Sequence, residues 1–241
     1  MMSNSYISRF LLFFLLALFE PATANAAVQT FTGTARRDGK VVYLEKHIVH
    51  FDSSGKVLDS ETNYELPSGK IHSTLTTNYQ TSLTAPSHVN LDHLTNSRYG
   101  IRYEKDQLIL FSQDQNQSEK TKIIPGDNSD HLMIGCQGLN YFIKQNLELA
   151  TSKNKRAIRL LVPGSLDSYD FELGYVGNKN GELEFELKPK SFFLRIFGPS
   201  FSIRYRDGKI SYYKGLSNIS YDGSGPKVVE ISYEYQALKE E

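Results

Sequence analysis

The stretch Phe201-Ser202-Ile203-Arg204-Tyr205-Arg206-Asp207-Gly208-Lys209 decides the fold class of this chain. Its apolar residues alternate with polar ones, which places apolar groups on one face of a strand and charged groups on the other. The Asp-Gly pair that follows is typical of a tight hairpin turn. The segment therefore predicts a β-hairpin with one buried face.

The same alternation recurs on both sides of this hairpin. Toward the C-terminus it continues through Val229, Ile231, Tyr233 and Tyr235, and before the hairpin it marks strands around Phe171–Tyr175 and Leu183–Leu187, joined by Asn178-Lys179-Asn180-Gly181. In the first half, turns at Asp38-Gly39, Ser53-Ser54-Gly55 and Pro67-Ser68-Gly69 separate predicted strands near 28–36, 41–51, 56–66 and 70–79, and a further hairpin crosses Lys105-Asp106. Residues 80–98 are polar and contain Pro86, so they are predicted to form a loop that has room for a short helix.

One segment has a helical period. Its apolar residues are spaced by three and four positions: Leu139, Phe142, Ile143, Leu147 and Ala150. Leu132 and Cys136 would extend this stripe back toward a cap at Ser129 or Asp130, so Cys136 is expected to be a buried, small hydrophobic residue. The fold class that follows is mainly β (β-rich α+β), a curved antiparallel sheet or incomplete β-barrel of about ten strands wrapped around one principal helix.

The N-terminus reads as a secretory signal. A polar stretch ends at Arg9, an apolar run covers Phe10–Phe19, and the small-residue segment ends in Ala24-Asn25-Ala26. This layout predicts a signal peptide over 1–26 and a single β-rich domain over 27–241. The competing interpretation is a membrane anchor, but the apolar run is about half the length that spans a bilayer. The expected location is periplasmic or secreted.

Charge and motifs limit the function classes. The 27 basic and 27 acidic residues cancel, which argues against nucleic acid as a partner. His47 and His50 would point to opposite faces of a strand, so no metal site and no cofactor are predicted. The sequence contains none of the common nucleophile, phosphate-loop or zinc-protease motifs, and no catalytic residue is predicted. A site assembled from scattered residues stays open, so enzymatic activity is disfavoured without being excluded.

Two charged or apolar segments have competing interpretations. Glu182, Glu184 and Glu186 alternate on a strand and are expected to pair across the sheet with Arg204 and Arg206. The heptapeptide Ser191–Phe197 is intensely apolar, follows Lys188 and Lys190, and ends at Gly198-Pro199. It either packs in the core or forms a lid or exposed tip that touches an acyl chain or an anionic membrane. The candidate ligand-binding residues are Phe192, Phe193, Leu194, Ile196 and Phe197.

A resemblance covers roughly residues 130–235. It rests on three short segments: Phe142-Ile143 with Asn146-Leu147 in the predicted helix, Leu160–Pro163 running into Leu166–Phe171, and Tyr213–Ile219. Their order resembles uncharacterised exported bacterial proteins and, more distantly, the superfamily of outer-membrane lipoprotein carriers, which are incomplete β-barrels wrapped around helices. The resemblance implies a periplasmic protein with an apolar cavity, and it supplies no catalytic residues.

Two function hypotheses follow. The first is a periplasmic binding or carrier module for an apolar lipid or acyl ligand, with peripheral membrane contact as a further expectation. The alternative is a non-catalytic structural or interaction protein of the cell envelope. The sequence identifies no protein partner.

Overall fold

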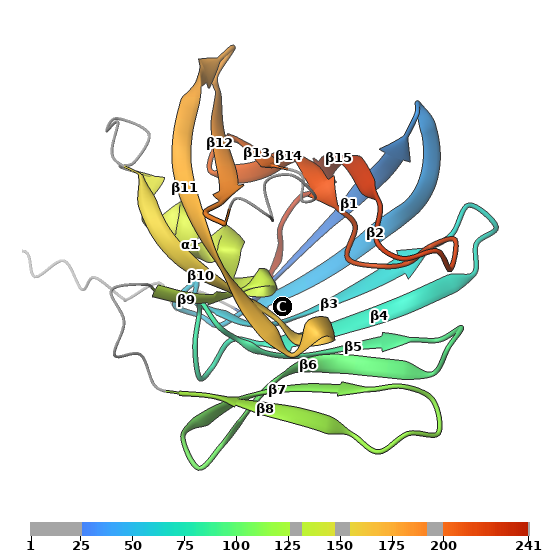
Figure 1. The fold of residues 1–241 in the computed structure, drawn as a ribbon. Helices are drawn as coiled ribbons and strands as arrows, with labels where there is room; N and C mark the ends of the chain where they lie inside the picture. The colour runs from blue at the N-terminus through green and yellow to red at the C-terminus, as the bar shows by residue number, and fades with distance from the viewer. Residues whose placement is uncertain (1–25, 126–131, 148–154, 192–199, 241) are drawn as a thin grey trace, which may run out of the picture.

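The computed structural model describes residues 26–125, 132–147, 155–191 and 200–240. Within them, 16 strands form one sheet (Figure 1). The strands are β1 (Ala27–Arg37), β2 (Lys40–Phe51), β3 (Val57–Glu65), β4 (Ile71–Asn78), β5 (Ser87–Asp92), β6 (Ser97–Glu104), β7 (Gln107–Gln113), β8 (Lys120–Ile124), β9 (Leu132–Gly135), β10 (Arg156–Val162), β11 (Asp167–Lys179), β12 (Glu182–Pro189), β13 (Phe201–Arg206), β14 (Lys209–Leu216), β15 (Val228–Tyr235) and β16 (Lys239–Glu240). Helix α1 covers Leu139–Gln145.

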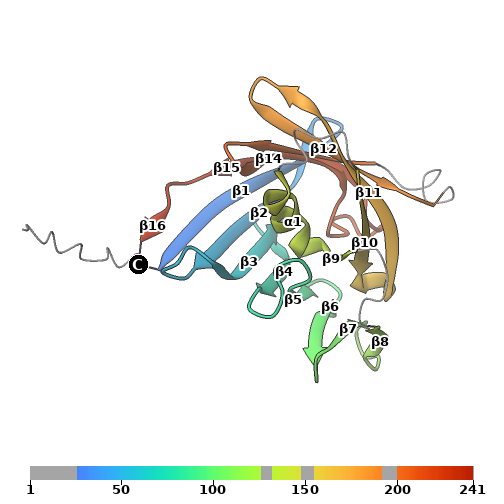
Figure 2. The ribbon, with the colours of Figure 1, turned by 90° about the vertical axis from the view of Figure 1, so that its left-hand side faces the viewer.

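The sheet is strongly curved but open. Its strand order runs from β8 through β1 to β15 and on to β9, with the short β16 paired to β1. Figures 1 and 2 show the curved sheet with the short helix α1 on its concave side, where its buried residues pack against β9–β13 and the whole sheet does not wrap around it as expected. Strands β8 and β9 are the two ends of the sheet. The expectation of a mainly β, curved sheet is confirmed, and the expected number of about ten strands is too low. Neighbouring strands pair antiparallel except β9 and β10, which are parallel.

The predicted hairpins form where expected. Asp38-Gly39, Asn180-Gly181 and Asp207-Gly208 have positive φ at both residues, which is the backbone of a two-residue turn matched to the twist of the strands. Ile203 and Tyr205 are buried on the inner face, and Arg206 lies 3.0 Å from Glu182 across the sheet. Arg204 likewise lies 3.5 Å from Glu184, so the predicted ion pairs of the outer face are confirmed.

The prediction for residues 80–98 is wrong in its second half. Ser87–Asp92 is strand β5, which pairs with β4 and β6. Its polar residues His88 and Asn90 are buried, whereas Val89 and Leu91 are each 37% exposed. The strand has its polar side chains inside and its apolar side chains outside, and this inversion conceals it from a hydrophobicity pattern.

The helix is shorter than predicted and begins later. Leu132–Gly135 is strand β9, followed by the 3₁₀ turn Cys136–Gly138, and α1 ends where the Asn146 side chain donates to the carbonyl of Phe142. Gly138 marks a close approach, since a Cβ there would lie 1.8 Å from the carbonyl oxygen of Thr84. The proposed cap at Ser129 or Asp130 and the last apolar position, Ala150, lie outside the described residues.

The main core lies between α1 and strands β9–β13, which we call the helix-covered half. Phe142 and Ile143 of α1 pack there against the buried residues Ile134, Ile158, Leu160, Phe171, Leu173, Phe185, Leu187, Ile203 and Tyr205. No helix in the described part of the chain is both long enough and apolar enough to cross a bilayer.

Candidate functional site

The two ends of the sheet meet without pairing, and we call the place where they meet the seam. Within the described residues, β8 pairs only with β7, and β9 pairs only with β10. Side chains bridge the gap instead: Lys122 of β8 lies 2.7 Å from Asp167 of β11, and Leu161 of β10 packs with Leu110 and Ile124. Among the described residues, the two sides of the seam are thus joined by side-chain contacts and by one backbone hydrogen bond, from the Gly135 amide of β9 to the Thr84 carbonyl over 2.8 Å.

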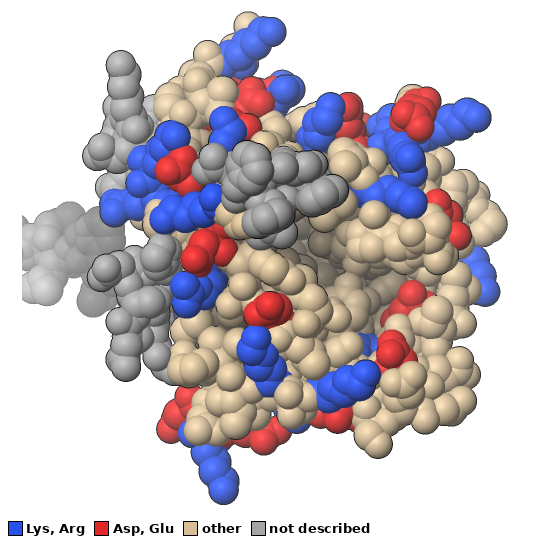
Figure 3. All heavy atoms as spheres, viewed as in Figure 1, with Lys and Arg blue, Asp and Glu red and all other residues tan. Residues whose placement is uncertain are grey.

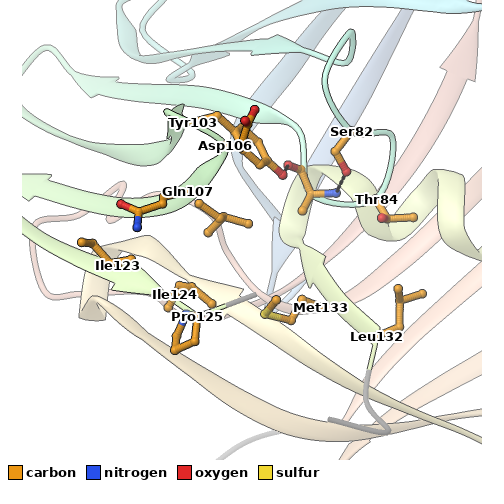
Figure 4. Close-up of a pocket in the computed structure, with 12 residues that line it drawn as sticks. Ser82, Thr84, Tyr103, Asp106, Gln107, Ile123, Ile124, Pro125, Leu132 and Met133 are labelled. Carbon is orange, nitrogen blue, oxygen red and sulfur yellow. Dashed lines mark hydrogen bonds between the residues drawn. The ribbon is translucent and has the colours of Figure 1, made fainter. Parts of the chain in front are cut away.

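A cavity of about 350 Å³ opens at this seam (Figure 4). We call it the seam cavity. Its lining is mainly apolar and comes from the loop before β5, the β6–β7 hairpin, β8 and β9: Ser82, Thr84, Ala85, Tyr103, Asp106, Gln107, Leu108, Ile123, Ile124, Pro125, Leu132 and Met133. The volume is at the lower end of the range for small-molecule sites, about 300–1,000 Å³.

The wall of the seam cavity is held by hydrogen bonds on one side and carries exposed apolar side chains on the other. Tyr103 Oη donates to the carbonyl of Ala85 over 2.8 Å, and the Ala85 amide donates to Ser82 Oγ over 3.0 Å (Figure 4). Across the cavity, Ile123 is 53% and Leu132 is 45% exposed. Large apolar side chains are therefore left facing solvent beside a pocket that an apolar ligand would fill.

A second concave feature lies inside the sheet, which we call the hollow. Tyr99, Tyr213 and Tyr233 are partly exposed and Cys136 is exposed, yet burial is the main cause of a raised pKa at each of them. Side chains that are reachable by solvent but surrounded by protein are expected in a deep recess. Figure 3 shows a recess in this face with mainly uncharged walls.

Cys136 is not the buried core residue that was predicted. Its place in a 3₁₀ turn, rather than on the inner stripe of a helix, leaves the side chain exposed. The surrounding protein raises the pKa of its thiol to about 11. The thiol is protonated at neutral pH, and this does not favour a nucleophilic role.

Buried polar residues face the interior of strands β2–β6, which we call the polar half. They are Glu45, Thr62, Ser73, Thr77, His88 and Asn90. Ser73 Oγ donates to Asn90 Oδ1 over 2.6 Å, and burial lowers the pKa of His88 to about 4. Buried polar groups are unfavourable unless they are paired, and here they share the inner face with buried residues such as Tyr43, Tyr64 and Leu75.

Glu45 is the centre of the best-connected group in the polar half. Its carboxylate oxygen Oε2 accepts a hydrogen bond from Tyr233 Oη over 3.1 Å and lies 3.2 Å from His47 Nε2. Thr62 Oγ1 lies 2.8 Å from the other ring nitrogen of His47. If the Thr62 hydroxyl donates to Nδ1, the ring proton is on Nε2 and points to the carboxylate.

The histidines fall as the strand pattern predicts. His47 faces inward, where its ring stacks on Phe31 at 4.2 Å, and His50 bonds Asp59 on the outer face. Among the described residues, no group of three or more His, Cys, Asp and Glu side chains is placed to hold a metal ion. The candidate ligand-binding residues Phe192, Phe193, Leu194, Ile196 and Phe197 lie outside the described residues. The seam cavity and the Glu45 group were both missed by sequence reasoning.

These features define an open, barrel-like β-sheet with an apolar cavity at its seam. No protein-family model and no curated protein matches the chain. A solved structure is similar: the crystal structure of a β-barrel-like protein of a domain of unknown function, DUF1849, from Brucella abortus. The two chains are 10% identical, with a TM-score of 0.47, over 90% of this chain and 98% of the other. A similarity at this level assigns neither a family nor a function.

Proposed function

We propose that this protein is an exported binding or carrier module for an apolar lipid or acyl ligand, which it holds in the seam cavity. The observation that carries the proposal is the cavity itself. It has about 350 Å³ of space, a mainly apolar lining, and exposed Ile123 and Leu132 at its side. Filling it with an acyl chain would remove apolar surface from water, worth about 25 cal/mol per Å².

The seam also supplies a route for entry. Widening the opening of the cavity between hydrogen-bonded strands would be unfavourable, because each broken backbone pair is left unsatisfied. At the seam no backbone pair joins β8 to β9 in the described residues. Separating them disturbs side-chain contacts such as the half-exposed pair Lys122–Asp167, which contributes on the order of 0–1 kcal/mol.

The absence of tryptophan from the chain allows a single-reporter test. Leu132→Trp places one indole at the seam cavity, and Leu94→Trp places one at a turn outside it. The two leucines are matched in exposure, at 45% and 46%. We expect dodecanoate to shift the emission of the Leu132→Trp protein to shorter wavelength and to leave the Leu94→Trp emission unchanged.

Native cargo gives the second measurement. Protein purified without detergent should release a lipid or fatty acid on organic extraction, detected by mass spectrometry. The proposal fails if the native protein releases no such molecule and the Leu132→Trp emission does not respond to dodecanoate. A structural or interaction role in the cell envelope would then be the better hypothesis.

A further inference from the structure

Glu45 is a buried carboxylate whose ion-pair partner among the described residues is a histidine, His47. Its side chain is 2% exposed, and within the described residues no lysine or arginine forms an ion pair with it. Taking a carboxylate out of water costs several kcal/mol unless charge and hydrogen bonds compensate. The two donors that reach it, Tyr233 Oη and His47 Nε2, both approach Oε2.

The other carboxylate oxygen is unused. Oε1 of Glu45 is buried and has no hydrogen-bond partner among the described residues. The same holds for the hydroxyl of Tyr43, which lies two residues earlier on the same face of β2. The negative charge of Glu45 acts on the buried phenol of Tyr43, whose pKa is raised first by burial and then by this charge. An acceptor and a hydroxyl in one neighbourhood are thus left without partners.

Aromatic rings pack against one another near Glu45. Tyr43 and Tyr64 lie edge to face at 6.0 Å between centroids, and Tyr233 and Phe31 do so at the same distance. The Glu45 charge also acts on Tyr64 and Tyr233. It adds to the larger rise in pKa that burial causes at each phenol. Tyr233 is partly exposed, so the group adjoins the hollow.

We propose that Glu45 is the acceptor for the primary ammonium group of a ligand that enters from the hollow. A carboxylate surrounded by aromatic faces binds ammonium by charge, by hydrogen bonding and by cation–π attraction. A primary ammonium has three donors, which suit Glu45 Oε1 and the Tyr43 hydroxyl oxygen. This site is separate from the seam cavity and does not depend on the function proposed above.

Calorimetry with 2-phenylethylammonium and its neutral counterpart 2-phenylethanol tests the proposal. The wild-type protein should bind the ammonium compound at least about tenfold more tightly than the alcohol, because only the former offers a charge to Glu45. Glu45→Gln keeps the shape and removes the charge, so it should abolish this preference. Glu61→Gln is the matched control, because it removes one charge from the adjacent strand β3 and should keep the preference.

Two further measurements keep the outcome interpretable. Tyr43→Phe removes only the free hydroxyl and should weaken ammonium binding severalfold, which tests the site even if Glu45→Gln does not fold. Dodecanoate binding to folded Glu45→Gln should be unchanged, which separates this site from the seam cavity. Equal wild-type affinity for the amine and the alcohol, no binding of the amine, or wild-type amine binding by folded Glu45→Gln would each overturn the proposal.

Discussion

The helix-covered half and the polar half of this sheet have the same backbone architecture and differ in the polarity of their inner faces. In the helix-covered half, Leu173, Phe185 and Leu187 are buried against α1, and the outer face carries charged pairs such as Arg206–Glu182. In the polar half, Glu45, Thr62, Asn90 and His88 are buried. The helix-covered half buries mainly apolar residues, whereas the polar half buries polar groups together with residues such as Tyr43, Tyr64 and Leu75.

A buried position in this protein is therefore not always part of the hydrophobic core. Apolar residues of the polar half, such as Val89 and Leu91, are partly exposed on its outer face. Some of the inner polar groups are hydrogen-bonded to one another, as from Thr62 of β3 to His47 and on to Glu45 of β2. Others, such as Glu45 Oε1 and Thr77 Oγ1, have no partner among the described residues. Mutations should therefore have different consequences in the two halves.

The largest expected effect is in the helix-covered half. Phe185→Ala empties a fully buried position whose ring lies against Tyr205 at 6.0 Å, and we expect a loss of about 3–5 kcal/mol in unfolding free energy. Leu91→Ala, on the outer face of the polar half, should change stability by less than about 0.5 kcal/mol. Urea unfolding measures both. Similar losses would show that the two halves do not differ as described.

The next effect concerns acid stability and belongs to the polar half. Burial lowers the pKa of His88 from 6.5 to about 4, so between these values the unfolded chain binds a proton that the folded protein does not. The unfolding free energy should therefore fall as the pH drops from about 6.5 to 4. The loss should be about 3 kcal/mol, at about 1.4 kcal/mol for each pH unit. His88→Asn should lose most of this dependence in unfolding measured across the interval. An unchanged acid slope would contradict the role given to His88.

A smaller effect is expected from the hydrogen-bonded pair of β4 and β5. Asn90→Leu leaves the buried hydroxyl of Ser73 without its acceptor, which should cost about 1–3 kcal/mol. Adding Ser73→Ala to Asn90→Leu removes the unpaired hydroxyl and should recover most of the lost unfolding free energy. A double-mutant cycle by thermal unfolding checks this. If the two changes are simply additive, the pair is not coupled and the inner polar face is not a connected network.

The smallest expected effect is at the seam between β8 and β9, the two ends of the sheet. Lys122→Ala breaks the half-exposed ion pair with Asp167 and should lower the unfolding free energy by about 0.2–1 kcal/mol. The same change should speed the exchange of dodecanoate, because it loosens the route into the seam cavity. Stopped-flow fluorescence of the Leu132→Trp protein, with and without Lys122→Ala, would measure this. Slower or equal exchange would argue against entry through the seam.

The sequence by itself determined the strands whose apolar residues point inward. Ile203 and Tyr205 alternate with Arg204 and Arg206 because one face meets the core and the other meets water, and the Asp-Gly pair sets the turn locally. This reasoning extends to the cross-strand ion pairs, since opposite charges at matching positions meet once the hairpin forms. Location, cargo and the role of the apolar heptapeptide stay predictions from the sequence.

The tertiary structure decided what lies inside the polar half and at the seam. Strand β5 is invisible to hydrophobic alternation because its inward side chains, His88 and Asn90, are polar. Asn90 accepts a hydrogen bond from Ser73 of β4, and His88 Nδ1 lies 3.2 Å from the carbonyl oxygen of Pro86, just before β5. The Glu45 group joins β2, β3 and β15, with Tyr233 lying 188 residues from Glu45 along the chain. The seam cavity likewise forms where the first and last thirds of the sheet approach each other. Periodicity reports which face of one strand is apolar, whereas a site is built from contacts between strands that only the folded sheet brings together.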